Sequence, residues 1–422
     1  MLRSPMAALL ATLALVALAS PAEARQATDS ARIAELERRL EAITREMESL
    51  RLGRDVVEAD TAMAGLGPAA SKVYRVSQGV SIGGYGEVLY ENYATTREDG
   101  SPATSRDAAD ALRAIVYFGY KFNDRLLFNS EIEIEHADEA FLEFAYVDYL
   151  LSDGLGVRAG LLLAPMGLVN ELHEPPVYLG TERPVTESVV IPTTWRENGV
   201  GLFGGHDALA WRVYVMNSLD GAGFGGSGLR GGRQKGSGAL AEDLGVAARV
   251  DWVGTLGLSV GGSGYYGGTG QGRELDGEVV HGAVTIWDVH ADYELAGLDL
   301  RALVAGARVG DVAALNTLNG LSGAEAIGEG MLGWYAQAGY DVLRGTASTH
   351  KLVPYVRYEE VDTQRSVAEG FAADPANDRS VLSLGVAWKP LPQIVAKADY
   401  QVHRNAADTG VDQWNLQLGW IF

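Results

Sequence analysis

The charged residues with the clearest spacing lie at every second position of two neighbouring segments. Glu131, Glu133 and Glu135 alternate with apolar residues, and Arg113 and Lys121 do the same in the preceding segment. A period of two puts such side chains on one face of a β-strand. Three carboxylates on one face can point neither into lipid nor into a dry core, because both would leave the charges unsolvated. The spacing therefore predicts strands with one apolar face and one wetted, charged face.

The same alternation places further charged side chains on the wetted face of later segments. The pore-lining set that we predict is Arg113, Lys121, Glu131, Glu133, Glu135, Arg158, Arg212, Arg249, Arg357 and Lys397. Further acids alternate onto the same face, so that acids and bases nearly balance and a solvated wall of paired charges explains them without any selective site. These acids are Asp148, Asp251, Asp288, Asp292, Asp341, Glu359 and Asp399.

One segment carries a local excess of basic residues. Arg230, Arg233 and Lys235 lie in the glycine-rich stretch 218–243. If this loop folds inward, it forms a cationic constriction, which is the candidate that we single out. If it stays outside, it is a flexible surface loop, which its glycines favour equally.

Motifs for catalysis or cofactor binding lack the structural context they need. Ser259 lies in a G-x-S-x-G match, but in mid-strand rather than between a strand and a helix. Gly221, Gly223 and Gly226 match a dinucleotide fingerprint with no helix after it. The seven histidines show no H-E-x-x-H spacing, and no cysteine is present to bind zinc. We expect no enzyme, with no catalytic, cofactor-binding or metal site, and an outer-membrane hydrolase is the weakest alternative.

Composition narrows the class of protein further. The chain of 422 residues contains 53 glycines and no cysteine. Its formal charge is −21, because 55 acidic residues outnumber 34 basic ones. A disulfide scaffold is excluded, and the acidic balance argues against nucleic-acid binding. A hydrophobic content of 47% excludes a disordered chain.

The first residues have the features of a targeting signal. An apolar stretch from Met6 to Ala19 follows Arg3, and small residues stand at Ala22 and Ala24. The stretch is shorter than the roughly 20 residues that span a bilayer as a helix. We predict a signal peptide over residues 1–24 and export of the rest. An uncleaved helical anchor is the alternative.

A short heptad pattern follows the signal. Apolar residues spaced alternately three and four apart predict a coiled-coil helix over residues 28–52, which needs partner helices because it is too short to be stable alone. They are Ile33, Leu36, Leu40, Ile43, Met47 and Leu50. A single amphipathic helix lying on its own protein is the alternative. Residues 53–78, with Gly65, Gly67 and Pro68, are predicted to be a linker.

The remaining residues, 79–422, have the pattern of a transmembrane β-barrel. Segments of about ten residues alternate in hydrophobicity and are joined by short and long connections in turn. The fold class that we predict is all-β: about 16 antiparallel strands, with 18 as the alternative, preceded by the short α-helical coiled coil. A barrel of this size leaves an aqueous channel. The long connections lie outside or fold into the lumen.

The segment Gln413–Phe422 has apolar residues at every second position and ends on phenylalanine. It resembles the C-terminal strand of bacterial outer-membrane proteins, which the barrel-assembly machinery reads. A soluble sandwich that happens to end on an aromatic residue is the alternative.

Residues 140–205 resemble the phosphate-selective porins of the O and P type. The motifs are Tyr146–Tyr149, Val157–Gly160, Ala164–Gly167, Glu182–Pro184 and Trp195–Gly201. The resemblance implies a trimeric, sixteen-stranded, water-filled outer-membrane channel with phosphate or another small anion as solute. The heptad segment is an addition to the family pattern.

We therefore expect an outer-membrane porin for passive diffusion of small hydrophilic solutes or ions, with an N-terminal periplasmic helix. A structural anchor or adhesin barrel with a plugged lumen is the main alternative. Expected partners are two further copies in a homotrimer, outer-membrane lipid and lipopolysaccharide, the barrel-assembly machinery and small solutes, with no nucleic acid.

Overall fold

The computed structural model describes residues 62–422. The signal peptide predicted for residues 1–24 and the heptad helix predicted for residues 28–52 lie outside the described residues. Among the residues that are described, no helix is both long and apolar enough to cross a membrane.

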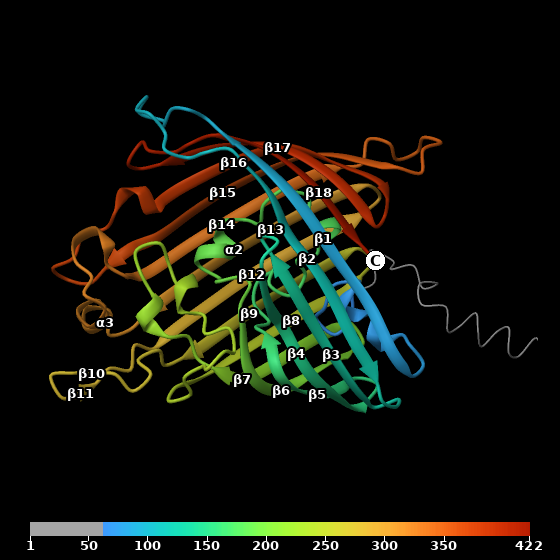
Figure 1. The fold of residues 1–422 in the computed structure, drawn as a ribbon, viewed down its shortest axis with the longest axis horizontal. Helices are drawn as coiled ribbons and strands as arrows, with labels where there is room; N and C mark the ends of the chain where they lie inside the picture. Colours follow the sequence, from blue (N-terminus) through green and yellow to red (C-terminus); the bar gives the residue numbers. More distant parts are fainter. Residues whose placement is uncertain (1–61) are drawn as a thin grey trace, which may run out of the picture. The chain divides into compact units, whose positions relative to one another are not determined.

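Sixteen antiparallel strands close into one barrel, which confirms the predicted antiparallel β-barrel and the smaller of the two predicted strand counts. Neighbours in sequence are neighbours in the wall, apart from a separate two-stranded ribbon of β10 (Glu274–Leu275) and β11 (Glu278–Val279). Figure 1 shows the strands side by side around the wall. They are β1 Gly79–Tyr93, β2 Ala108–Lys121, β3 Leu126–Glu135, β4 Glu139–Ser152, β5 Leu155–Leu163, β6 Arg196–His206, β7 Leu209–Asn217, β8 Leu244–Thr255, β9 Leu258–Gly267, β12 Val284–Leu295, β13 Leu298–Val309, β14 Gly328–Tyr340, β15 Lys351–Val367, β16 Asp378–Leu391, β17 Ile394–Asn405 and β18 Gln413–Ile421.

The barrel closes where β1 pairs with β18. The register sets Tyr85 opposite Ile421 and continues through nine residue pairs. Beyond it, Gly84 and Phe422 exchange two backbone hydrogen bonds, of 3.0 and 2.9 Å. No strand of the wall is left with an unpaired edge, so the backbone groups of the whole ladder are satisfied.

Alternation along each strand sorts the side chains between two faces. On β2, Val116 and Phe118 are exposed, whereas Ile115 and Tyr117 are only 2% and 3% exposed. The outward face is apolar and uncovered, and the inward face is covered by chain inside the barrel. The period of two therefore fixes which residues can form a site.

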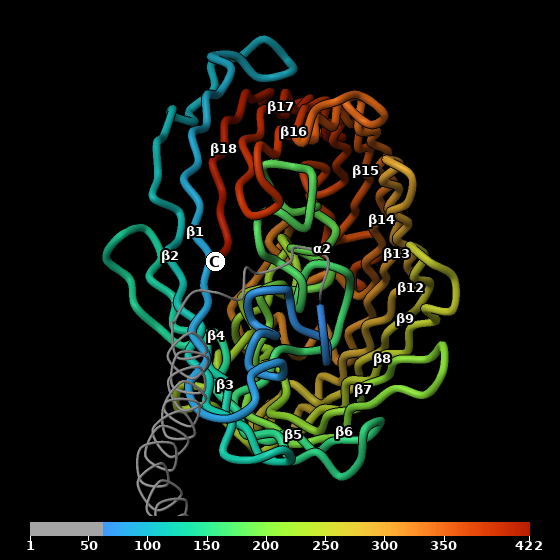
Figure 2. Tube along the Cα trace, turned by 90° about the vertical axis from the view of Figure 1, so that its right-hand side faces the viewer, coloured from blue at the N-terminus to red at the C-terminus, as the bar shows by residue number. Residues whose placement is uncertain are grey.

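Three segments occupy the interior, and Figure 2 shows two of them, in blue and green, within the ring of strands. Residues 62–78, called the N-terminal segment from here on, precede β1 and contain the 3-10 helix η1 (Ala70–Tyr74). Residues 164–195 join β5 to β6 and contain η2 (Pro175–Val177) and α2 (Thr186–Val189). The third segment, 218–243 between β7 and β8, packs onto the second and contains η3 (Gly221–Gly223) and η4 (Arg230–Gly232).

The remaining short elements lie in the connections between later strands. The helix α3 (Val312–Asn319) and the 3-10 helix η5 (Gly323–Glu325) join β13 to β14, and η6 (Pro375–Asn377) precedes β16. The described part of the predicted linker, residues 62–78, leads into β1 and is folded into the barrel.

The connection formed by residues 164–195, called the inward loop from here on, is held in place by a core of buried apolar side chains. Ile191 and Trp195 are fully buried, together with Val284 and Ile286 of β12. The Trp195 ring meets the Tyr265 ring edge-on, with centroids 4.7 Å apart. Such burial fixes the loop against the wall, because moving it would expose the apolar side chains to water.

The closing strands should tolerate no added side chain at Gly84. A Cβ there would lie 2.3 Å from the Ile115 carbonyl oxygen and 2.6 Å from the Phe422 ring. We expect Gly84→Val to lower the yield of folded barrel severalfold, measured as the fraction that shifts mobility on heating in a detergent gel. Gly264→Val is the matched control, since a Cβ there meets only one atom, at 3.9 Å. Equal yields for both variants would contradict the tight closure.

Candidate functional site

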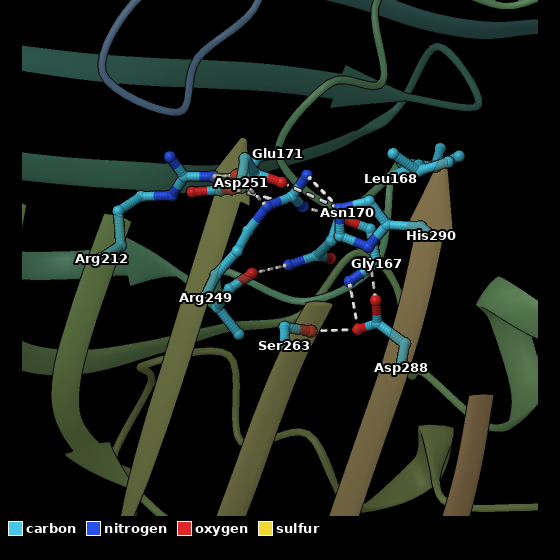
Figure 3. A network of polar contacts seen from close by, with 12 residues as sticks. Gly167, Leu168, Asn170, Glu171, Arg212, Arg249, Asp251, Ser263, Asp288 and His290 are labelled. Carbon is cyan, nitrogen blue, oxygen red and sulfur yellow. Dashed lines mark hydrogen bonds and ion pairs between the residues drawn. The ribbon is translucent and has the colours of Figure 1, made fainter. Parts of the chain in front are cut away.

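Polar and charged side chains of four strands, β7, β8, β9 and β12, form one network in the interior, shown in Figure 3. Asp251 on β8 accepts from Arg249 Nε at 2.8 Å and contacts His290 Nε2 at 2.9 Å. The other ring nitrogen of His290 lies 2.6 Å from Asp288. Asp288 also accepts from the Gly167 backbone N–H at 3.1 Å. Two carboxylates therefore hold the histidine, and the same cluster holds the start of the inward loop.

The loop contributes its own charge to this network. Glu171 lies 2.9 Å from Arg212 and 3.9 Å from Arg249. Arg212 also bonds Asp251 at 3.3 Å. Asn170 closes the loop on itself, since its amide oxygen accepts from the Trp195 backbone N–H at 2.6 Å. Predicted pore residues Arg212 and Arg249 thus serve as anchors for the loop.

This network is not arranged for nucleophilic chemistry. Ser263 donates its hydroxyl proton to Asp288, while His290 contacts Asp288 and Asp251. The histidine is therefore not placed to take the proton of this serine, as a serine nucleophile would require. Among residues 62–422, no cluster of three or more histidine, aspartate or glutamate side chains could hold a metal ion.

A second cluster lies on β1 to β4. Arg113 Nε sits 2.9 Å from Glu87 and 3.7 Å from Glu133. Glu131 faces His173 of the inward loop at 3.5 Å. Glu131 and Glu133 are 0% and 3% exposed, so the expectation that these two carboxylates face open water is wrong. Guanidinium groups and the inward loop take the place of water around them.

Arg158 is one of the buried arginines in the predicted set. It forms a bidentate pair with Asp148, at 2.9 and 3.0 Å, and donates to the Tyr74 hydroxyl at 2.7 Å. Its guanidinium carbon lies 4.1 Å from the centre of the Tyr146 ring and 4.6 Å from that of Phe203. This arginine is 3% exposed and ties the N-terminal segment to the wall.

Arg357, Lys397 and Lys121 hold backbone carbonyls of interior segments. Arg357 donates to the Glu182 carbonyl at 3.0 Å, and Lys397 donates to the Gly180 carbonyl at 2.8 Å. Lys121 donates to a carbonyl of the N-terminal segment at 2.9 Å. Of the ten predicted pore residues, Glu135 is among those that keep partial exposure. The structure places the ten on the inner face, and their lining of a pore stays a prediction.

The three basic residues singled out in segment 218–243 lie on an inward-folded loop, where Arg230 and Arg233 are half-buried and Lys235 is exposed. Arg233 Nη1 donates to the Thr194 carbonyl at 2.8 Å. Burial, and next the charge of Arg230, lower the pKa of Arg233 to about 9. Burial, and next the charge of Arg183, lower the pKa of Arg230 to about 10. Both guanidinium groups stay charged at neutral pH, and both repel their basic neighbours.

Sequence reasoning missed three residues of these clusters. Glu87 shares the inward face of β1 with Tyr85 and Leu89, and the period of two along this strand could have identified it. Glu143 pairs with Arg196 at 2.6 Å, but a bulge between β3 and β4 breaks the period of two there. Arg183 lies in the long inward loop, which carries no periodic signal.

Glu174 of the inward loop receives the N-terminal segment. Its carboxylate accepts from the backbone N–H groups of Ala69 and Ala70, each at 3.1 Å. Burial and, less strongly, the negative charge of Glu131 raise the pKa of Glu174 to about 7, although the two N–H groups and the Tyr117 hydroxyl oppose the rise. The carboxyl group is thus stable in its neutral form across the acidic range.

No family model matches the chain. An uncharacterized protein of Aquifex aeolicus (strain VF5) is 37% identical over 393 residues, which span 88% of this chain and 87% of that protein.

Solved structures share the barrel at low sequence identity. Salmonella typhi OmpF in complex with daunomycin matches with a TM-score of 0.54 and 13% identity, over 82% of this chain and 98% of that one. OmpT of Vibrio cholerae in trimer form matches with a TM-score of 0.51 and 12% identity, over 82% of this chain and 100% of that one. An anion-selective porin from Comamonas acidovorans matches with a TM-score of 0.51 and 12% identity, over 81% of this chain and 99% of that one. None of these three structures is described as a phosphate-selective porin, so the resemblance to the O and P type stays a prediction.

The raised pKa of Glu174 predicts a pH-dependent stability. A carboxyl whose folded pKa of about 7 exceeds its ordinary 4.5 contributes stability below 4.5 that is lost as the pH rises through 7. His173 stays neutral over this window, because burial lowers its pKa to about 4. The unfolding temperature of the native chain should therefore fall, relative to Glu174→Gln, between pH 4.5 and 7. A difference between the two proteins that is constant with pH would contradict this.

Proposed function

The chain belongs to the same family as the uncharacterized Aquifex aeolicus protein, and we propose that it is an outer-membrane channel for passive diffusion of small hydrophilic solutes or ions. The observation that carries this proposal is the inverted polarity of the barrel. Many of its outward side chains are apolar and exposed, and the charged clusters described above point inward. The exposed outward residues include Val116, Phe118, Ile132, Leu142, Val213, Val250, Leu384 and Leu416.

A lipid bilayer is the environment that such a surface fits. Lipid tails solvate the apolar face, and a closed barrel needs no water for its backbone groups. Exposed tryptophan and tyrosine side chains on the outward face suit the two membrane–water interfaces. They include Tyr90, Tyr149, Trp252, Tyr266, Trp287, Tyr340, Trp388 and Trp414. In this proposal the barrel lies in the outer membrane of a bacterial cell, with an N-terminal periplasmic helix and a homotrimeric assembly.

Water inside the barrel is supported by charges that stay partly exposed there. Arg183, Arg230 and Arg233 are half-buried although they lie on interior segments. A sixteen-stranded wall is wide enough for water to continue past such groups, whereas a wall of eight strands is filled by side chains. Small polar solutes would follow this water.

The same arginines support a preference for small anions, with phosphate as the solute that the resemblance implies. Guanidinium groups bind oxyanions through charge-assisted hydrogen bonds, and crowding of Arg183, Arg230 and Arg233 makes a bound anion favourable. Burial and mutual repulsion already lower the pKa of Arg233 to about 9, which an anion would offset. Glu135 and Glu143 oppose this field, so the preference that we propose is weak.

A second candidate function is a structural anchor or adhesin barrel with a plugged lumen. The interior segments 62–78, 164–195 and 218–243 favour it, because they fill much of the space between the walls. Conductance distinguishes the two functions, since a plugged anchor passes no current.

The purified, folded protein should open ion-conducting steps in a planar lipid bilayer. The current should rise with salt concentration, because the ions move through water rather than through a carrier site. Heat-denatured protein from the same preparation is the control. A folded, heat-modifiable barrel that opens no steps would refute the channel and favour the anchor.

Neutralising the interior arginines should shift ion selectivity toward cations. We expect the double variant Arg230→Gln and Arg233→Gln to lower the anion-to-cation permeability ratio roughly two-fold, measured from reversal potentials in a salt gradient. Arg308→Gln is the matched control, because the Arg308 side chain is 79% exposed and pairs with Glu329. Equal shifts in both proteins would place the loop away from the ion path.

A further inference from the structure

The first described residues bury apolar side chains inside the barrel. Leu66, Ala69, Ala70 and Val73 are each 3% exposed or less. They pack in one cluster with inward side chains of the wall. Those wall residues are Tyr85, Ile115, Tyr117, Leu127, Phe144, Tyr146, Leu162, Leu163, Phe203, Tyr214 and Ile421. A segment that only connected two domains would not be packed in this way.

The wall beneath the segment is a row of aromatic rings on β1, β2 and β4. Ring centroids lie 6.0 Å apart from Tyr85 to Tyr117, 5.9 Å from Tyr117 to Phe144 and 5.3 Å from Phe144 to Tyr146. An uncovered apolar row of this kind would face the water of the lumen at a cost in free energy. The N-terminal segment removes that cost by covering the row.

Directed polar contacts fix the segment on the wall. The Tyr74 hydroxyl donates to Asp148 at 2.5 Å and accepts from Arg158 at 2.7 Å. The Asn129 amide donates to the Ala70 carbonyl at 2.9 Å. Three strands therefore supply partners, which defines both the position and the direction of the segment.

The segment is also locked to the inward loop through two glycines. A Cβ on Gly67 would lie 2.5 Å from a Glu174 carboxylate oxygen, and one on Gly65 would lie 2.5 Å from a Glu171 oxygen. Gly65 in addition has a φ of +79°, which favours glycine. Only glycine allows the backbone to approach both carboxylates, and Glu174 accepts two of its N–H groups.

We propose that residues 63–74 are a lumen plug, an internal ligand for the surface formed by the aromatic row, Asp148, Glu171 and Glu174. The plug narrows the channel on the side where residues 75–78 lead into β1. This inference rests on the proposed channel function and adds to it a named element that limits conductance.

Removal of the plug should widen the channel. A chain in which residues 25–77 are deleted, so that the predicted signal joins Gln78, should show single-channel conductance at least about two-fold above that of the full chain. The control deletes residues 25–59 and keeps the plug, so its conductance should equal that of the full chain. Equal, non-zero conductance in all three would refute the plug and leave the channel standing. No conductance in any folded form would refute both.

A point variant tests the same contact without shortening the chain. Gly67→Val would push a side chain into Glu174 and should raise conductance toward that of the plug deletion. Gly264→Val on β9 is the matched control, because a Cβ there meets only one atom, at 3.9 Å, and this atom belongs neither to the plug nor to segment 218–243. Unchanged conductance for a folded Gly67→Val protein would contradict the proposal.

Because the chain contains no cysteine, thiol labelling reports the position of the plug directly. Ser71 is 0% exposed and Met63 is 44% exposed. A charged, membrane-impermeant methanethiosulfonate should modify Met63→Cys at least about ten-fold faster than Ser71→Cys in the folded protein. Adding Gly67→Val should speed the reaction of Ser71→Cys. Equal rates for Met63→Cys and Ser71→Cys would show that the segment is not docked.

Discussion

The pairing of β1 with β18 is the constraint on which the rest of the structure depends. It turns a sheet of sixteen strands into a wall without an edge, so that each strand finds hydrogen-bond partners on both sides. Once the wall is closed, the period of two leaves one face for apolar side chains and the other for charged ones. The apolar face can then meet lipid, and the charged face has to be satisfied from inside the barrel.

Inside the barrel, buried charged side chains are satisfied by pairing with other groups of the protein. A buried charge without a partner costs several kcal/mol, so an enclosed carboxylate needs a cation or hydrogen-bond donors close to it. Asp251 has Arg249 and His290, and Glu174 has the backbone N–H groups of Ala69 and Ala70. The interior segments supply several of these partners. The same contacts that stabilise the charges therefore position the segments inside the barrel.

Much of the wall could be predicted from the sequence because its signal is local. The alternation around Glu131 and Glu133 identifies a strand and its inward face, and the strand count follows from repeating this pattern. The interior could not be predicted in the same way. Ala69 and Glu174 are 105 residues apart and lie in segments without periodicity. Gly65 and Gly67 have the composition of a linker, and only the closed barrel shows that they admit two carboxylates.

Liposome swelling tests the central claim, passive diffusion through the barrel, most directly. Vesicles that contain the folded protein should swell in uncharged sugars, at a rate that falls steadily as the sugar becomes larger. Such a dependence on size is expected of a water-filled path and not of a saturable binding site. Vesicles with folded protein that swell no faster than protein-free vesicles, even in the smallest sugar, would contradict the channel.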